Sequence, residues 1–165
     1  MRLYLLSEAD AAPNKNDAQR KLTPKGIASL GKLAEFLEKK GLMKVAEIRH
    51  SPLVSARQTA EYFKKKVGLE AKLREVPLLE PCDDFRILAD IVNKSKEDLL
   101  LVGHKPNLSM LASYLLTRNS RLDLFSLRKS GLMYLKRIDA THTLPGWDFN
   151  WQLRWLIVPG ILKKM

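Results

Sequence analysis

The chain has 165 residues, a formal net charge of +11 and one cysteine, Cys82, and its length fits one domain spanning residues 1–165. No apolar run approaches the roughly 20 residues of a membrane span, the start MRLYLL lacks the features of a secretory signal, and a lone cysteine excludes a disulfide framework and fits a reducing cytoplasm. The charge is spread over many segments without interleaved aromatic residues, which favours a solvated basic exterior and argues against nucleic acid or a membrane as partner.

Strands and helices are expected to alternate along the first three quarters of the chain. Apolar runs bounded by turn residues predict four strands, at 2–6, 45–48, 73–76 and 99–102. Helical spacing of apolar residues predicts four helices, at 24–40, 53–67, 85–92 and 106–116. Thr23 suits the N-cap of the first helix with Pro24 at its first position, and Gly41 and Gly68 suit helix ends.

Two more strands are expected near the carboxyl end, at 132–135 and 149–156, with a loop at 141–146 between them. The alternation of Phe149, Trp151, Leu153 and Trp155 is typical of an antiparallel strand with one buried face. The continuous Leu/Val run at 99–102 is typical of a parallel strand that is buried on both faces. The order of elements predicts an α/β three-layer sandwich, with a mostly parallel central sheet, helices on both faces and an antiparallel C-terminal strand.

Polar residues follow three of the predicted parallel strands. Ser7 and Glu8 follow the first, the turn that leads to Ser55 follows the second, and His104 follows the strand at 99–102. Because the carboxyl ends of parallel strands meet at one edge of a sheet, we expect these residues to share a crevice. Helix N-termini would face the crevice, and they favour anions, so the pattern indicates a phosphate-like ligand.

Several segments carry a resemblance that extends over nearly the whole chain. They read MRLYLL, LTPKG, SPLVSARQTAE, LLEPCDD, LLLVGHKPNLSMLASYLL and NWQLRWLIVPGIL. Together they resemble the SixA-like phosphohistidine phosphatases, a small branch of the histidine phosphatase, or phosphoglycerate mutase-like, superfamily.

The resemblance implies a specific chemistry. In that family the first strand ends in an Arg-His-Gly motif, whose His attacks phosphorus and becomes a transient phosphohistidine that water hydrolyses. Two arginines and a second His hold the phosphoryl oxygens, and that second His corresponds to His104. A basic side chain before the Leu-Thr motif often lies near the pocket and corresponds to Lys21. The resemblance implies no metal ion and no cofactor, and it implies a partner protein that carries phosphohistidine.

This chain departs from the family pattern at the positions that carry the chemistry. The segment Ser7-Glu8-Ala9 stands where the family has Arg-His-Gly, and Ser55 stands at the position of the second Arg. Arg57 comes two residues too late, which turns it about 200° around a helix and makes it a poor substitute. Of the four core residues only His104 is retained.

These replacements predict a catalytically inactive chain. Loss of a residue that forms a covalent intermediate can cost on the order of 10⁶ in rate. Ser7 and Ser55 each donate one hydrogen bond but lack the charge and the bidentate geometry of a guanidinium. An ionised Glu8 adds repulsion of up to roughly 4 kcal/mol per phosphate charge, at ~4 Å and an effective dielectric of about 20. The chain is therefore interpreted as a natural pseudoenzyme or as an altered version of an active parent.

Other hypotheses stay open. The chain can be an active phosphohistidine phosphatase by a modified route, in which Glu8 forms an acyl phosphate. That route needs a divalent cation, for which the candidate carboxylates are Glu8, Asp10, Glu80, Asp83 and Asp84. Alternatively, Glu8 pairs with His104 and closes the pocket. His50 and His142 lack ligand-spaced partners and are expected to be structural. The last alternative is a binding module that uses the basic surface for an acidic partner.

Overall fold

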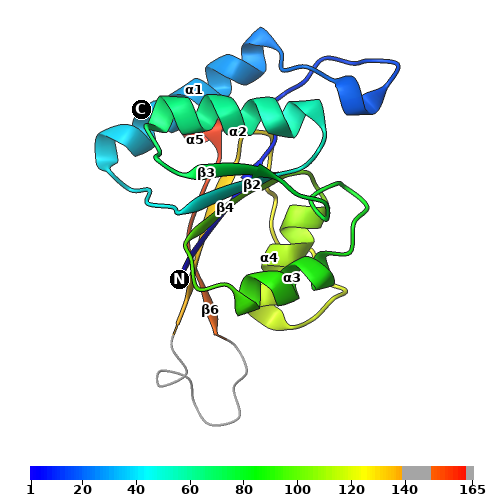
Figure 1. The fold of residues 1–165 in the computed structure, drawn as a ribbon, viewed down its shortest axis with the longest axis vertical. Coiled ribbons are helices and arrows are strands. Elements are labelled where there is room, and N and C mark those ends of the chain that lie inside the picture. Colours follow the sequence, from blue (N-terminus) through cyan, green and yellow to red (C-terminus); the bar gives the residue numbers. More distant parts are fainter. Residues whose placement is uncertain (139–149, 163–165) are drawn as a thin grey trace.

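The first strand, β1 (Arg2–Ser7), lies inside a six-stranded sheet in the computed structural model, which describes residues 1–138 and 150–162. The strands lie in the order β3-β2-β4-β1-β5-β6 (Figure 1). The other strands are β2 (Glu47–His50), β3 (Lys72–Glu75), β4 (Leu99–Gly103), β5 (Leu132–Arg137) and β6 (Trp151–Ile157). Strands β1, β2, β3 and β4 pair in parallel, as the alternation of strands and helices predicts.

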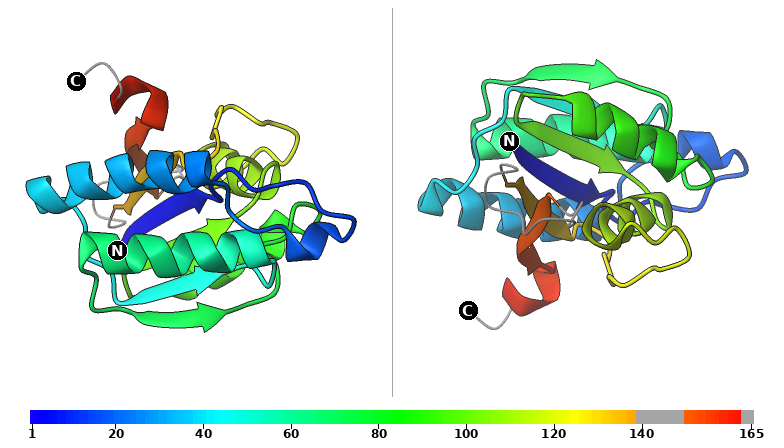
Figure 2. Two further views of the ribbon diagram at one scale, coloured as in Figure 1. Left: turned by 90° about the horizontal axis from the view of Figure 1, so that it is seen from above. Right: turned by 90° about the horizontal axis from the view of Figure 1, so that it is seen from below.

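Helices cover both faces of this sheet, which confirms the predicted sandwich (Figures 1 and 2). The helices are η1 (Asp17–Gln19), α1 (Pro24–Lys40), α2 (Val54–Val67), α3 (Phe85–Lys94), α4 (Asn107–Thr117) and α5 (Pro159–Leu162). Helices α1 and α2 pack on one face, and α3 and α4 pack on the other. No helix of the described residues is long and apolar enough to cross a membrane.

The sheet separates two apolar cores because neighbouring residues of a strand point to opposite faces. On one side Tyr4 and Leu6 of β1 and Leu100 of β4 pack against α1 and α2. On the other side Leu3 and Leu101 pack against α3 and α4. Strand β4 is buried along its whole length, as its unbroken apolar run predicts.

The helix ends follow the predicted capping residues. The Thr23 side chain accepts a hydrogen bond from the Gly26 amide, with Pro24 at the first helical position. Gly41 ends α1 and Gly68 ends α2, both in the left-handed conformation that glycine adopts at low cost. These features depend only on neighbours in the sequence, and for this reason the sequence predicts them well.

Strand β2 is shifted from the predicted range of 45–48. Val45 is buried but precedes the ladder, and the strand continues to His50, which pairs with Val102 and Glu75. An apolar run indicates which residues are buried. The bounds of a strand depend instead on which of its residues pair with the neighbouring strands.

The carboxyl-terminal strands confirm one expectation and correct another. Strand β5 is antiparallel to β1, and β6 is antiparallel to β5. The prediction that Trp151, Leu153 and Trp155 share one buried face is wrong. The register shifts between Tyr134 and Leu135, so that Trp151 packs in the core under α3 and α4 while Trp155 packs on the opposite face. Phe149, His142 and the predicted loop at 141–146 lie outside the described residues.

Candidate functional site

Of the residues predicted to meet at the strand ends, Ser7, Glu8 and His104 come together where β1 and β4 end side by side. Ser7 is paired with Gly103, and the Glu8 amide donates a hydrogen bond to the Gly103 carbonyl at 2.9 Å. A side chain at position 103 would approach the Leu79 carbonyl to 2.7 Å, so glycine lets the chain pass closely there. Glu8 and His104 therefore directly follow two neighbouring strands, at the same end of the sheet.

Glu8 is buried and both of its carboxylate oxygens have partners. Its Oε1 lies 3.3 Å from Nδ1 of His104 and forms an ion pair with Nζ of Lys129. Its Oε2 accepts a hydrogen bond from the Ser7 hydroxyl at 3.3 Å. The Glu8 side chain is 9% exposed, whereas that of Lys129 is 43% exposed. The carboxylate is therefore held inside the protein by a cation that reaches in from the surface.

The charge state of Glu8 follows from these contacts. Burial acts to raise the pKa of Glu8, but hydrogen bonds and charge attraction from His104 and Lys129 outweigh it and lower the pKa below its ordinary value. Glu8 is consequently ionised at neutral pH. The position at which the family resemblance places a nucleophilic imidazole carries a buried negative charge.

The His104 imidazole is oriented by the same contact. The 3.3 Å approach of Nδ1 to Glu8 requires the proton to be on Nδ1. Its Nε2 is buried and has no hydrogen-bond partner among the described residues. One ring nitrogen of His104 is thus engaged by Glu8, and the other is enclosed by the protein.

Ser55 lies at the start of α2, where it is buried. Its carbonyl accepts a hydrogen bond from the Thr59 hydroxyl at 2.7 Å, and the Thr59 oxygen accepts one from the Ala9 amide at 3.0 Å. These two hydrogen bonds link the first turns of α2 to the segment that follows Glu8. Within the described residues no hydrogen bond or ion pair joins the Ser55 side chain to Glu8. Arg57 is exposed, consistent with its position around the helix.

Lys21 is not part of this cluster. It is exposed beside the short bridge between Ala11 and Leu22, and its carbonyl accepts a hydrogen bond from the Ala12 amide. The structure therefore brings together Ser7, Glu8 and His104 but gives Lys21 no contact with them.

The carboxylates proposed for a cation do not gather. The Asp10 carboxylate accepts from the Thr23 hydroxyl, that of Asp83 accepts from the Glu80 amide, and that of Asp84 pairs with Arg86. Across residues 1–138 and 150–162, no three His, Cys, Asp or Glu side chains are grouped as metal ligands. The described geometry therefore lends no support to a route through a metal-bound Glu8.

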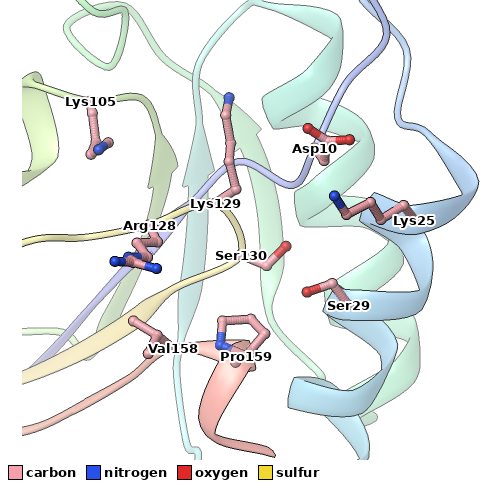
Figure 3. Close-up of a pocket in the computed structure, with 10 residues that line it drawn as sticks. Asp10, Lys25, Ser29, Lys105, Arg128, Lys129, Ser130, Val158 and Pro159 are labelled. Atoms are coloured by element: carbon pink, nitrogen blue, oxygen red, sulfur yellow. The ribbon is translucent and has the colours of Figure 1, made fainter. Parts of the chain in front are cut away.

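Sequence reasoning missed Lys129, which lies 121 positions from Glu8 along the chain. Lys129 precedes β5, and the Ser130 amide beside it donates to the Glu8 carbonyl. The only local signal is the run Arg128-Lys129, which is indistinguishable from the other basic pairs of this cationic chain. Lys129 also lines a pocket of about 540 Å³ next to the Glu8 cluster, shown in Figure 3.

Comparison with known proteins agrees with the fold. Residues 13–79 match the histidine phosphatase superfamily (branch 1). This range begins after Glu8 and ends before His104. No curated protein sequence matches the chain.

Solved structures are similar over nearly the whole chain. The protein histidine phosphatase SixA complexed with tungstate has 21% sequence identity and a TM-score of 0.82, covering 98% of this chain and 99% of that one. SixA from Agrobacterium tumefaciens has 20% identity and a TM-score of 0.73, covering 96% and 97%. A mycobacterial glucosyl-3-phosphoglycerate phosphatase has 16% identity and a TM-score of 0.66, covering 93% and 96%. The chain therefore has the fold of the SixA phosphohistidine phosphatases, and its residues 13–79 match the histidine phosphatase superfamily.

Proposed function

We propose that this chain is a non-catalytic SixA-like protein in which a buried carboxylate replaces the nucleophile. The observation that supports this most strongly is the contact of Glu8 with His104 and Lys129. The retained histidine and the nearest cation are both directed at an internal negative charge. They are therefore not free to receive a phosphoryl group.

Glu8 is a poor nucleophile in this setting. Both carboxylate oxygens accept hydrogen bonds or ion pairs, and the lowered pKa reflects a stabilised anion. An approaching phosphoryl dianion would meet repulsion of roughly 4 kcal/mol per charge at ~4 Å and an effective dielectric of about 20. Ser7 and Ser55 supply no compensating charge, because each hydroxyl is neutral. Replacement of a covalent nucleophile costs on the order of 10⁶ in rate even without this repulsion.

Restoration of the family residues tests the proposal. The triple variant Ser7→Arg, Glu8→His and Ser55→Arg removes the internal carboxylate and releases His104 and Lys129. The matched control is Ser7→Arg, Glu8→Ala and Ser55→Arg, which restores the two arginines without a nucleophile. Phosphate release is measured from a phosphohistidine phosphocarrier protein. We expect release by the first variant, and none by the control or by the unmodified chain.

Two outcomes would contradict the proposal. A folded triple variant that releases no phosphate would show that Ser7, Glu8 and Ser55 do not occupy the positions assigned to them. Rapid release by the unmodified chain would show that catalysis survives the replacements. In that case Glu8→Ala separates the routes, because only a mechanism through the carboxylate loses activity in this variant.

The remaining assignments belong to the same proposal. The SixA fold suggests a partner protein that carries phosphohistidine. The lone cysteine suggests that the cytoplasm is the cellular compartment of this chain. We further propose that residues 1–165 form one domain, since both apolar cores are built on the same sheet. Loss of the phosphoryl-binding arginines implies that association with such a partner does not depend on its phosphorylation.

A further inference from the structure

The pocket beside the Glu8 cluster is formed by parts of the chain that are far apart in sequence. The start of α1, the segment before β5 and the start of α5 surround it (Figure 3). Its volume of about 540 Å³ suits a small organic molecule. Ser7, Glu8, Ser55 and His104 do not line it, although Lys129 belongs to both the pocket and the Glu8 cluster.

The pocket lining is strongly cationic. Lys25, Lys105, Arg128 and Lys129 line it, against the single carboxylate of Asp10. Lys129 is neutralised by Glu8, but Lys25, Lys105 and Arg128 have no ion-pair partner in the described part of the chain. Three like charges around one concave surface repel one another, and a bound anion would relieve that repulsion.

One polar group of the pocket lining, the Ser130 hydroxyl, is buried. Ser130 is 1% exposed, and its hydroxyl has no hydrogen-bond partner within residues 1–138 and 150–162. Its φ of 56° is in the left-handed region, which is uncommon for a residue other than glycine. Figure 3 shows this hydroxyl turned toward Ser29 across the pocket. Unsatisfied buried groups and strained backbone are concentrated at binding sites in proteins.

The opposite side of the pocket is apolar. Val158 and Pro159 form this side, and Pro159 is buried at the start of α5. A ligand that fills the pocket therefore meets cations on one side and hydrocarbon on the other.

From the cavity, its three cations without an ion-pair partner among the described residues, and the buried Ser130 hydroxyl, we propose that this pocket binds a small organic dianion with an apolar group. Lys25, Lys105 and Arg128 attract the anionic end, and Val158 and Pro159 pack against the apolar end. A phosphate monoester and an aromatic dicarboxylate share this chemistry. This inference goes beyond the proposed function and holds whether or not the Glu8 centre is active.

Titration with small probes tests the proposal. Phenyl phosphate and isophthalate represent the two ligand types, and inorganic phosphate and benzyl alcohol each carry only one of the required features. Affinities are measured by calorimetry at low ionic strength, and the site is mapped by amide NMR shifts. We expect phenyl phosphate or isophthalate to bind at least tenfold more tightly than inorganic phosphate, and benzyl alcohol not to bind. The shifts should centre on Ser29, Ser130 and Gly160.

Charge-matched variants separate the pocket from the general basic surface. Lys25→Ala and Arg128→Ala should each weaken binding at least fivefold. Lys96→Ala removes the same charge from an exposed position before β4, at the amino ends of the parallel strands. This variant should change the affinity less than twofold. Equal losses in all three variants, absence of binding by both dianions, or shifts centred on Glu8 and His104 would each overturn the assignment. Failure of the restored triple variant to release phosphate would leave these results unaffected.

Discussion

Removal of the Lys129 charge is the most direct test of how Glu8 is held in the protein. Lys129→Met keeps most of the side-chain stem and deletes the ammonium group. Loss of one partner from a buried ion pair costs about 3–5 kcal/mol, whereas exposed pairs contribute about 0–1 kcal/mol. The Glu8 side chain is 9% exposed but that of Lys129 is 43% exposed, and His104 still contacts the carboxylate after the change. We therefore expect a loss of about 1–2 kcal/mol in the free energy of unfolding at neutral pH.

Thermal and urea unfolding measure this loss. For a domain of this size, about 1–2 kcal/mol corresponds to a fall in Tm of roughly 3–6 °C. Lys96→Met is the matched control, because it deletes one exposed cation with the same change of net charge. The control should lie within about 0.5 kcal/mol of the unmodified chain, as surface substitutions usually do.

The pH dependence of the Lys129→Met effect identifies its cause. Glu8 has a pKa lowered from 4.5 in the folded protein, so its ion pair stabilises the fold above about pH 4.5 and loses this effect as the pH falls through the folded-state pKa. The destabilisation relative to Lys96→Met should be largest at neutral pH and should shrink in acid. Equal stabilities of the two variants at neutral pH, or a difference that does not change with pH, would refute the ion-pair account of Glu8.

Two further predictions concern residues outside the Glu8 cluster. Gly26→Ala should lower the free energy of unfolding by at least about 1 kcal/mol, because the added methyl would overlap the Asp10 backbone. The control is Gly160→Ala, whose added methyl meets no atom within 4 Å and should leave the free energy of unfolding nearly unchanged in the same urea titration. Arg86→Met should raise the pKa of Asp84 from about 2 toward its ordinary value of 3.8, because hydrogen bonds from Arg86 are the main cause of the low value. An NMR titration of the Asp84 carboxyl that shows no change would contradict this cause.

Local chemistry explains how much of the site could be predicted. Strand ends and the glycine at position 103 are visible in the sequence, and parallel pairing then places Glu8 and His104 together. The prediction that Arg57 points away from Ser55 likewise needs only helical geometry, and the side chain of Arg57 is exposed whereas Ser55 is buried. The contact between Glu8 and His104, one of the alternatives left open by the sequence, is the one the structure displays.

The sequence by itself determined the order of the main strands and helices and the capping residues at the helix ends, since each depends on residues that are neighbours along the chain. Only the tertiary structure decided that Lys129 binds Glu8, that Lys21 lies apart from the cluster and that Trp155 packs on the opposite face from Trp151. The reason is physical. An ion pair across 121 positions and a one-residue shift of register both depend on how separate elements pack, and no local pattern of side chains records that packing.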